Sequence, residues 1–325
     1  MIVKKAVMIG LSGHFEYALP YMRRLGLGFE AIYCDPREET DGGVARLVKN
    51  GFDVRFADSE EALYRSSPDI CVVNSIPGLN AGFAERALKR GCSVFCEKPL
   101  ATEKEALLSL RGAYLSSGRH IAGMFGTSFT GHVAAAKKAM GLIGEPRLIT
   151  AQKSYKLGRR EDYYFDRSLF GGIIPWVTIH SLDWVYTLTG LLPVGCDGRI
   201  GTTRVDGRGD IETEAVCRFE LSNGAELVTT ADYLRPSGAP THDDDRIRIA
   251  GDRGVLEISG GTATVTDRDG ERRLDPVAPA DIFEDFVKGD RGEAHENTAR
   301  KAFDLTEWAL EARDIAYDLA LKRKK

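Results

Sequence analysis

The sequence contains no long apolar run of the kind that crosses a membrane. A transmembrane helix needs about 20 consecutive apolar residues, and the apolar runs of this 325-residue chain are far shorter. No basic stretch followed by an apolar one, the pattern of a secretory leader, precedes the first apolar segment. These absences argue against a membrane or secreted protein, so we expect a cytoplasmic one.

The chain also has a small net charge and few cysteines. The formal net charge of −4 provides no large basic field for nucleic acid. The six cysteines fall mostly in strand-like segments, and Cys92 and Cys96 stand too far apart along one such segment to share a zinc ion. We therefore expect free buried thiols and no metal.

The first 120 residues alternate between strand-like and helix-like segments. Strands buried on both faces of a parallel sheet appear as continuous apolar runs. Such runs occupy residues 5–10, 29–35, 53–56, 70–75, 93–96 and 120–125. Asn80 is a good N-cap for one intervening helix, which Gly91 would end, and Thr102 with Glu105 forms a capping box for another. The alternation predicts an α/β fold with a doubly wound parallel sheet.

A glycine turn and an acidic residue follow the first two predicted strands. Gly10 and Gly13 lie in the turn, and Asp35 ends the second strand 25 residues after Gly10. In dinucleotide-binding folds such a turn lets the backbone approach the pyrophosphate, and the acid binds the ribose hydroxyls. The pattern is degenerate, because Ser12 and Phe15 stand where two further glycines are expected.

Each residue near this turn also has a plainer interpretation. Asp35 could be an ordinary strand-end cap, although its position favours ribose binding and hence NAD. Arg37 could accept a 2′-phosphate, which leaves NADP open. His14 could simply fill the widened turn, and Asn80 is first of all a helix cap.

The run Cys96-Glu97-Lys98-Pro99-Leu100 follows the predicted strand 93–96. Open α/β sheets bind ligands at the carboxyl ends of their strands, and Pro99 holds Lys98 out of the α region. An ammonium fixed there can orient a hydroxyl or donate a proton. A surface lysine at a strand end is the alternative, and the surrounding pattern favours the functional interpretation.

The second half of the chain has a different pattern. From residue 211 onward strand-like segments follow one another, with Asn223-Gly224 as a strong hairpin signal. Arg246 and Arg248 alternate with apolar residues, which indicates a sheet with one packed face and one face that is polar or covered by a partner. The change of pattern predicts two domains, residues 1–122 and 123–325.

A histidine in the segment 170–184 is the second candidate for chemistry. If the chain is helical from Trp176 onward, Trp176, His180 and Asp183 share one face. His180 is then a candidate general base, since its ordinary pKa lies near neutral pH; a structural histidine bonded to Asp183 is the alternative. Tyr163 and Tyr164 either line a substrate pocket or pack under a loop.

In the order and spacing of these motifs, the chain resembles the glucose–fructose oxidoreductase/inositol dehydrogenase (Gfo/Idh/MocA) family of NAD(P)-dependent oxidoreductases. The shared features are the glycine turn, Asp35-Pro36, Ser75-Ile76-Pro77, Glu97-Lys98-Pro99, Gly171-Gly172 with His180 and Asp183, and the strand pattern of residues 246–257. The resemblance implies an N-terminal Rossmann domain, a second α+β domain with an open, mostly antiparallel sheet, and nicotinamide stacked between them. It also implies a homodimer or homotetramer paired through the open sheet face.

The resemblance further implies a role for each candidate residue. Catalysis would fall to Lys98, His180 and Asp183, and substrate contacts to Trp176, Tyr163 and Tyr164. The cofactor would be held by Gly10, Ser12, Gly13, His14, Asp35, Arg37, Ser75, Ile76, Pro77, Asn80, Glu97 and Lys98. The expected reaction is hydride transfer between NAD, or NADP, and a secondary alcohol of a sugar, cyclitol or related polyol.

One departure from the family pattern bears on that reaction. Relatives often carry an aspartate four residues before the histidine, where this chain has Trp176. An indole cannot relay a proton, although it can stack on a sugar ring. A non-catalytic dinucleotide- or sugar-binding regulator, or a glycosidase that oxidises its substrate transiently with bound NAD, is therefore the alternative.

Overall fold

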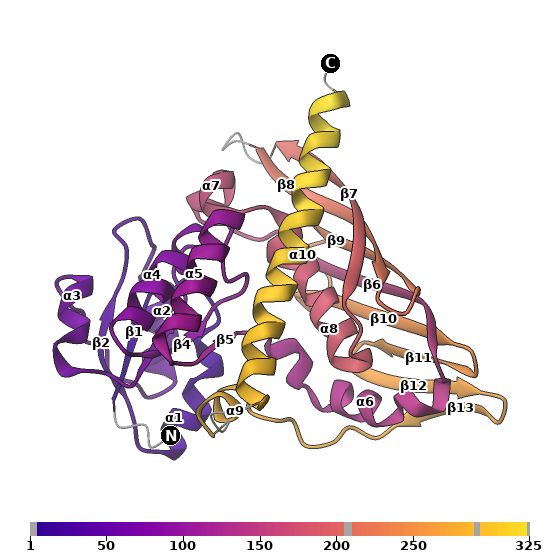
Figure 1. Ribbon diagram of the computed structural model, residues 1–325, viewed down its shortest axis with the longest axis horizontal. Helices are drawn as coiled ribbons and strands as arrows, with labels where there is room; N and C mark the ends of the chain where they lie inside the picture. Colours follow the sequence, from indigo (N-terminus) through magenta and orange to yellow (C-terminus); the bar gives the residue numbers. More distant parts are fainter. Residues whose placement is uncertain (1–4, 205–209, 289–292, 324–325) are drawn as a thin grey trace. The chain divides into compact units, whose positions relative to one another are not determined.

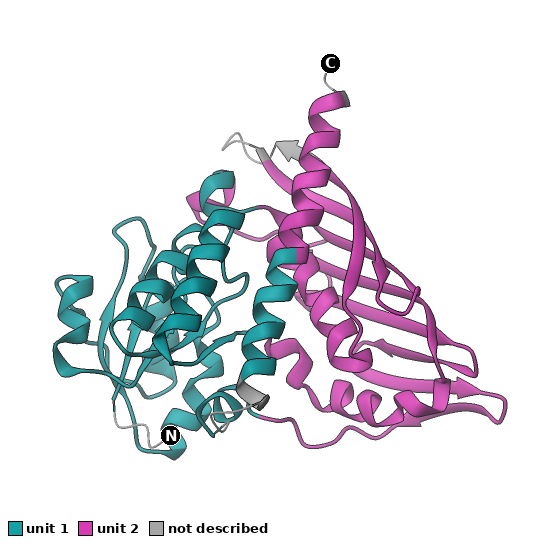
Figure 2. Ribbon diagram, viewed as in Figure 1, with its two compact units in different colours: residues 1–124, 166–171, 281–307 teal, residues 125–165, 172–280, 308–325 magenta. Residues whose placement is uncertain are grey.

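A computed structural model describes residues 5–204, 210–288 and 293–323 (Figure 1). The chain divides into two compact units (Figure 2). Unit 1 comprises Met1–Met124, Asp166–Gly171 and Asp281–Glu307, and unit 2 comprises Phe125–Phe165, Gly172–Ala280 and Trp308–Lys325. The first segment of unit 1 thus ends near the predicted boundary at residue 122, and two later segments also belong to that unit.

Parallel strands form the centre of unit 1. Over the described residues its sheet has five strands in the order β2-β1-β3-β4-β5. They are β1 (Ala6–Ile9), β2 (Phe29–Tyr33), β3 (Ile70–Val73), β4 (Ser93–Cys96) and β5 (Ile121–Gly123). Every residue of β1, β3 and β4 is buried, as expected for strands covered on both faces. The predicted doubly wound parallel sheet is confirmed.

Helices connect and cover these strands. They are α1 (Leu19–Arg24), α2 (Asp41–Lys49), α3 (Glu60–Leu63), α4 (Pro77–Lys89), α5 (Lys104–Ser117), α7 (Arg167–Phe170) and α9 (Ile282–Lys288), with 3₁₀ turns η1 (Phe15–Tyr17) and η2 (Tyr64–Ser66). Helix α9 packs two aromatic rings on β4, because the centroids of Phe283 and Phe286 lie 5.1 and 5.4 Å from that of Phe95. A late segment of the chain therefore completes the core of unit 1.

Three local predictions in unit 1 were wrong. Residues 53–56 form no strand but a single bridge between Ile32 and Phe56, since most of their side chains stay outside the core. Helix α4 begins at Pro77 rather than after Asn80, because proline suits the first helical turn. Helix α5 begins at Lys104, with Glu103 at the N-cap and no side-chain cap bond, so the predicted capping box is not formed.

The sheet of unit 2 is mostly antiparallel. Over the described residues it has eight strands in the order β13-β12-β11-β10-β6-β9-β8-β7, and β6–β9 is its parallel pair. The strands are β6 (Pro146–Lys156), β7 (Pro193–Arg204), β8 (Asp210–Leu221), β9 (Glu226–Arg235), β10 (Asp243–Gly251), β11 (Gly254–Ser259), β12 (Thr262–Asp267) and β13 (Gly270–Leu274). The predicted hairpin at Asn223-Gly224 is confirmed by the antiparallel pairing of β8 with β9.

Helices cover one face of this sheet (Figure 1). They are α6 (Gly131–Ile143), α8 (Ile179–Thr189) and the final part of α10 (Glu293–Arg323). A Cβ at Gly198 of β7 would lie 2.7 Å from the carbonyl oxygen of Ala312, so α10 approaches the strand closely. Short turns η3 (Gly126–Phe129), η4 (Asp162–Phe165) and η5 (Ile174–Thr178) complete the unit.

The opposite face of the sheet of unit 2 is open. Arg246 and Arg248 are exposed on β10, whereas Ile247 and Ile249 are buried, as their alternation predicted. Five large apolar side chains are also exposed on the strands of this sheet: Leu148, Val194, Val216, Val228 and Leu234. Within the described part of the chain, no helix is long and apolar enough to cross a membrane.

Candidate functional site

The turn after β1 brings the ends of β1 and β3 into contact. Gly10 has φ +82°, and a Cβ on it would lie 2.3 Å from Cα of Ser75. A Cβ on Gly13 would lie 2.4 Å from Oε2 of Glu97. Glycine is therefore required at Gly10, by close approach to the backbone and by conformation, whereas a side chain at Gly13 would displace the carboxylate of Glu97.

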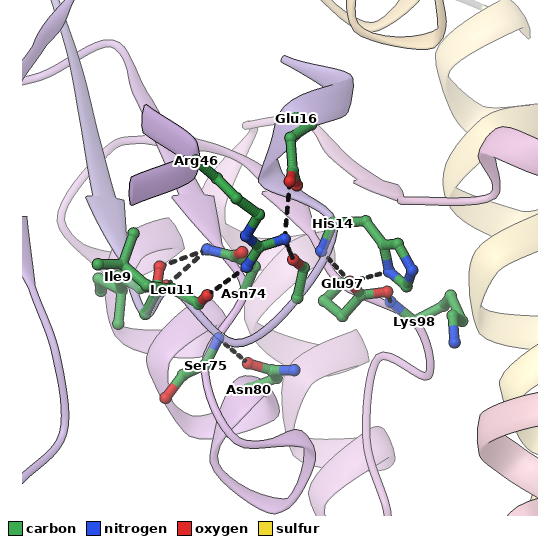
Figure 3. A network of polar contacts seen from close by, with 12 residues as sticks. Ile9, Leu11, His14, Glu16, Arg46, Asn74, Ser75, Asn80, Glu97 and Lys98 are labelled. Carbon is green, nitrogen blue, oxygen red and sulfur yellow. Dashed lines mark hydrogen bonds and ion pairs between the residues drawn. The ribbon is translucent and has the colours of Figure 1, made fainter. Parts of the chain in front are cut away.

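Protein groups accept a hydrogen bond from each backbone N–H of this turn, and Figure 3 shows the bond between His14 and Glu97. The N–H of Gly10 donates to the carbonyl of Tyr33 at 2.8 Å, and those of Ser12 and Gly13 donate to the carbonyl of Asn74 at 3.2 and 3.1 Å. The other two donate to carboxylates: Leu11 N–H to Glu38 Oε2 at 2.9 Å, and His14 N–H to Glu97 Oε2 at 2.6 Å. Two acids thus hold the turn.

Glu97 is a buried carboxylate that contacts the imidazole of His14 and the backbone of Lys98. Its Oε2 also lies 2.7 Å from Nδ1 of His14, and its Oε1 accepts the N–H of Lys98 at 2.9 Å. Burial acts to raise the pKa of Glu97, but the charges of His14 and Lys98 and the hydrogen bonds outweigh it and lower that pKa. Lys98 follows β4 and is 1% exposed.

Two acids follow β2, and they have different partners. Asp35 is paired with Arg37, whose Nε and Nη2 lie 2.8 and 3.1 Å from its oxygens. Glu38 is buried and turns back to the glycine turn, where its Oε2 also accepts the hydroxyl of Ser12 at 3.0 Å. Its Oε1 accepts the hydroxyl of Ser75 and, at 3.3 Å, the N–H of Asp35.

The sequence pattern selects Asp35 and Arg37 but neither Glu38 nor Arg46, which also contact the turn. Arg46 of α2 donates to the carbonyls of Leu11 and Gly13 at 2.7 and 3.1 Å, and so holds the turn from its acceptor side. A second acid three residues after Asp35 was a usable signal for Glu38. Nothing in the local sequence of α2 indicates that the side chain of Arg46 contacts the glycine turn.

Ser75, Ile76 and Pro77 join β3 to α4, and Asn80 lies in the first turns of that helix. The side chain of Asn80 does not cap the helix; its Oδ1 accepts the N–H of Ser75 at 2.9 Å. Asn80 therefore fixes the end of β3 against α4, close to the glycine turn (Figure 3).

The second set of candidates lies in unit 2, around a π-helical turn. Residues Ile174–Thr178 form this turn, η5, and α8 follows it directly. The N–H of Ile179 donates to the carbonyl of Ile174, five residues back, so the α-helical spacing assumed for Trp176 and His180 does not hold across it. Such turns are frequent at functional sites.

The glycine pair before η5 has a steric reason. Gly172 has φ +98°, and a Cβ on it would lie 2.6 Å from Oε2 of Glu212. That same carboxylate accepts the N–H of Ile173 at 2.9 Å. The start of the π-helical turn is therefore fixed by Glu212 of β8.

The predicted catalytic pair and the predicted substrate residues of unit 2 have separate sets of contacts. His180 is 6% exposed and Asp183 is fully buried; Asp183 accepts the hydroxyls of Ser128 and, at 3.4 Å, Thr187. The aromatic candidates form their own cluster: Tyr163 stacks on Tyr164 at 4.6 Å, and Tyr164 meets Trp176 edge-on at 6.2 Å between centroids.

A buried lysine, which the sequence analysis did not single out, lies near this set. Lys153 of β6 has no exposed surface; its Nζ lies 2.8 Å from Asp245 Oδ2 and 3.4 Å from the ring centroid of Trp184. Burial is the main cause that lowers its pKa, and the charges of Asp245 and Asp183 act against that shift.

The two sets differ in what they can bind. In unit 1 the carboxyl ends of β1, β2, β3 and β4 bring together a glycine turn, acids and Lys98, which fits a dinucleotide held by the turn 10–14, the acids after β2 and the segment 75–77. The set in unit 2 offers an imidazole, a carboxylate and aromatic faces, which fits a hydroxylated substrate. Among the residues that the structure describes, no cluster of three His, Cys, Asp or Glu side chains could hold a metal ion.

Comparisons with known proteins agree with the two-domain fold. Residues 4–116 match the family model described as an oxidoreductase family with an NAD-binding Rossmann fold, and residues 133–257 match that of the GFO/IDH/MocA C-terminal domain. A solved structure from Thermotoga maritima, assigned as an oxidoreductase, is 37% identical with a TM-score of 0.91, over 96% of this chain and 98% of that one.

Two further relatives are more distant. An inositol dehydrogenase homolog from Azotobacter vinelandii, solved with NAD⁺, is 18% identical with a TM-score of 0.77, over 98% of this chain and 97% of that one, a likeness of fold alone. The inositol 2-dehydrogenase of Rhizobium meliloti is 26% identical over 211 residues, which span 63% of this chain and 61% of that enzyme. The chain belongs to the GFO/IDH/MocA family of oxidoreductases and carries an NAD-binding Rossmann domain.

Proposed function

We propose that this protein is an NAD-dependent dehydrogenase that acts on a secondary alcohol of a sugar, cyclitol or related polyol. The observation that carries the proposal is Lys98, a buried lysine at the carboxyl end of β4 beside the carboxylate of Glu97. The similarity to an inositol 2-dehydrogenase supports the polyol class.

Lys98 has the role of orienting the reacting oxygen. Its ammonium would donate a hydrogen bond to the hydroxyl of the substrate and stabilise negative charge as the proton leaves. NAD, when bound, supplies the hydride chemistry, and the protein supplies orientation and electrostatics.

His180 has the role of taking or giving the hydroxyl proton. Asp183 lies three residues further along α8 and is held by the hydroxyls of Ser128 and Thr187, so it would orient the imidazole. Trp176, in the position where relatives often carry an acid, would stack on an apolar face of the sugar ring, with Tyr163 and Tyr164 behind it.

The proposal also covers the choice between NAD and NADP, the oligomeric state and the cellular location. The acids after β2 would repel a 2′-phosphate, so NAD is favoured over NADP. The exposed apolar residues on the sheet of unit 2 suit pairing with a second copy, as a homodimer or homotetramer. A cytoplasmic location stays a prediction.

A panel of sugars and polyols with NAD and with NADP tests the proposal. Nicotinamide absorbance and product release are followed together. We expect NAD reduction with at least one polyol. Binding of cofactor and sugar without turnover would point instead to a regulator, and product release without net reduction to a glycosidase.

A further inference from the structure

Glu38 connects the three strand ends at which a dinucleotide would lie. Its carboxylate reaches the turn after β1 through Leu11 and Ser12, the end of β3 through Ser75, and the end of β2 through the N–H of Asp35. It is 9% exposed. A carboxylate at this junction lies where the acid of a dinucleotide-binding fold meets the ribose hydroxyls.

Asp35, the acid that the sequence pattern selects, has a different partner. Its two oxygens engage Nε and Nη2 of Arg37 in a bidentate ion pair, and its Oδ1 also accepts the N–H of Arg37 at 3.0 Å. The side chain of Arg37 is 53% exposed. These contacts direct the carboxylate of Asp35 towards an exposed guanidinium, whereas Glu38 faces the glycine turn.

We propose that Glu38, rather than Asp35, is the acid that recognises the adenine ribose of NAD and excludes the 2′-phosphate of NADP. The inference rests on the NAD binding of the proposed function and names the specificity residue within that site. The backbone N–H groups of Leu11 and Asp35 hold the carboxylate in place, and the hydroxyls of Ser12 and Ser75 supply its other two hydrogen bonds.

The hydrogen bonds from those two serine hydroxyls can be replaced by hydrogen bonds from the ligand. A hydroxyl rotates freely and both donates and accepts, so the 2′- and 3′-hydroxyls of a ribose can donate to Glu38 in place of Ser12 and Ser75. The serine oxygens then remain available as acceptors. A 2′-phosphate offers no comparable donor and brings close to two negative charges towards a buried carboxylate, where salt screens the repulsion weakly.

The test titrates the 325-residue chain with NAD, NADP and the 2′-deoxyadenosine analogue of NAD by calorimetry. The variants are Glu38→Gln, which keeps the shape of the side chain, Asp35→Asn, and Glu39→Gln as a matched control that removes an exposed neighbouring charge. In the parent we expect the loss of the 2′-hydroxyl to weaken binding roughly tenfold, the scale of one hydrogen bond to a charged group.

If Glu38 binds the ribose, the effect of removing the 2′-hydroxyl on affinity depends on whether Glu38 is present. If Glu38 only supports the fold, that effect is the same in the parent and in the variant. Glu38→Gln should weaken NAD roughly tenfold and bind NAD and its deoxy analogue about equally, while Asp35→Asn and Glu39→Gln keep the parental difference. The assignment fails if Asp35→Asn, and not Glu38→Gln, abolishes that difference, or if Glu38→Gln binds NAD as tightly as the parent. Should Glu38→Gln not fold, the result for Asp35→Asn alone decides in the same way.

The same titrations distinguish this inference from the proposed function. They require no polyol turnover, so a failed substrate panel leaves them intact. A parent that binds neither dinucleotide would overturn the cofactor assignment and this inference together, whereas binding that depends on Asp35 would overturn this inference alone.

Discussion

Glu97 is a carboxylate whose ionised form is favoured in the folded chain. Its pKa is lowered from the ordinary value of 4.5 because neighbouring charges and hydrogen bonds outweigh burial. A carboxyl with a lower pKa in the folded than in the unfolded chain stabilises the fold above its unfolded pKa, and this contribution is lost as the pH falls through the folded pKa.

Glu97→Gln should therefore lower the free energy of unfolding at neutral pH by about 1–3 kcal/mol, the scale for hydrogen bonds to a buried charge. Urea unfolding of parent and variant checks this. The difference between them should shrink as the pH is lowered below about 4.5, and a difference that stays constant with pH would contradict the assigned ionisation.

Lys98 and His180 carry the proposed chemistry. Lys98→Ala and His180→Ala should each lower kcat by about a hundredfold or more, the usual scale for a positioned acid–base group. The affinity for NAD should change much less for His180→Ala, because His180 belongs to the substrate side. Steady-state kinetics and NAD titration measure both quantities, and near-parental turnover in both variants would rule out the assignment.

Trp176 places an aromatic side chain where relatives often carry an acid. Trp176→Asp should raise KM for the polyol without raising kcat, because the lost stacking area is not compensated by a productive proton relay. Trp176→Phe keeps an aromatic face and should be mild. Kinetics on an identified substrate decide, and a Trp176→Asp variant with faster turnover would show that the indole only obstructs the site.

Residues that act at their own position in the sequence were easier to predict than residues that reach across the fold. Lys98 lies two residues after an apolar strand and precedes Pro99, so its place at the end of β4 could be predicted. Glu38 and Arg46 contact the glycine turn only through side chains that extend from a later turn and helix. No spacing rule for the turn itself includes them.

At the scale of elements, an ion pair joins two neighbouring strands of unit 2. Lys153 of β6 and Asp245 of β10 are register partners, and their side chains meet at 2.8 Å with Lys153 fully buried. Removing one partner of a buried pair leaves an uncompensated charge, which costs about 3–5 kcal/mol. The double replacement by apolar residues is usually much less harmful.

Asp245→Asn should accordingly lower the free energy of unfolding by about 3–5 kcal/mol, while Lys153→Met combined with Asp245→Leu recovers most of the loss. The control is Asp244→Asn, which breaks the pair with the exposed Arg246 and a longer contact with Arg235 and should cost less than Asp245→Asn, because pairs near the surface contribute about 1 kcal/mol or less. Urea unfolding measures all three. Equal losses for Asp245→Asn and Asp244→Asn would mean that burial of Lys153 has no energetic consequence.

The elements that the sequence analysis missed lack an apolar pattern. Strand β7 contains three glycines in Pro193–Arg204, and β13 consists largely of exposed polar residues; both are strands because neighbouring strands pair with them. Conversely, residues 53–56 have a strand-like composition and only one bridge, at Phe56. The hairpin at Asn223-Gly224 was predictable because its turn chemistry is local.

At the scale of the whole molecule, the open sheet face of unit 2 carries the prediction of assembly. Val216, Val228 and Leu234 are exposed at 49%, 37% and 64%, and clustered exposed apolar residues mark interaction surfaces. Sedimentation velocity should show a dimer or tetramer. The double variant Val216→Asp with Val228→Asp should shift it towards monomer, whereas Leu115→Asp, at an exposed position on α5, should not. A monomeric parent at high concentration would contradict the prediction.

The contribution of α9 to the core of unit 1 also has a consequence for biosynthesis. Phe283 and Phe286 cover Phe95, yet they leave the ribosome long after β1 to β5 have been made. Until then the nascent sheet exposes an apolar face, while all the strands of unit 2 are still being translated. The synthesis of unit 1 thus begins before that of unit 2, but its core is completed only when α9 has been made. We therefore expect a chaperone to bind the nascent chain at strands β1 to β5.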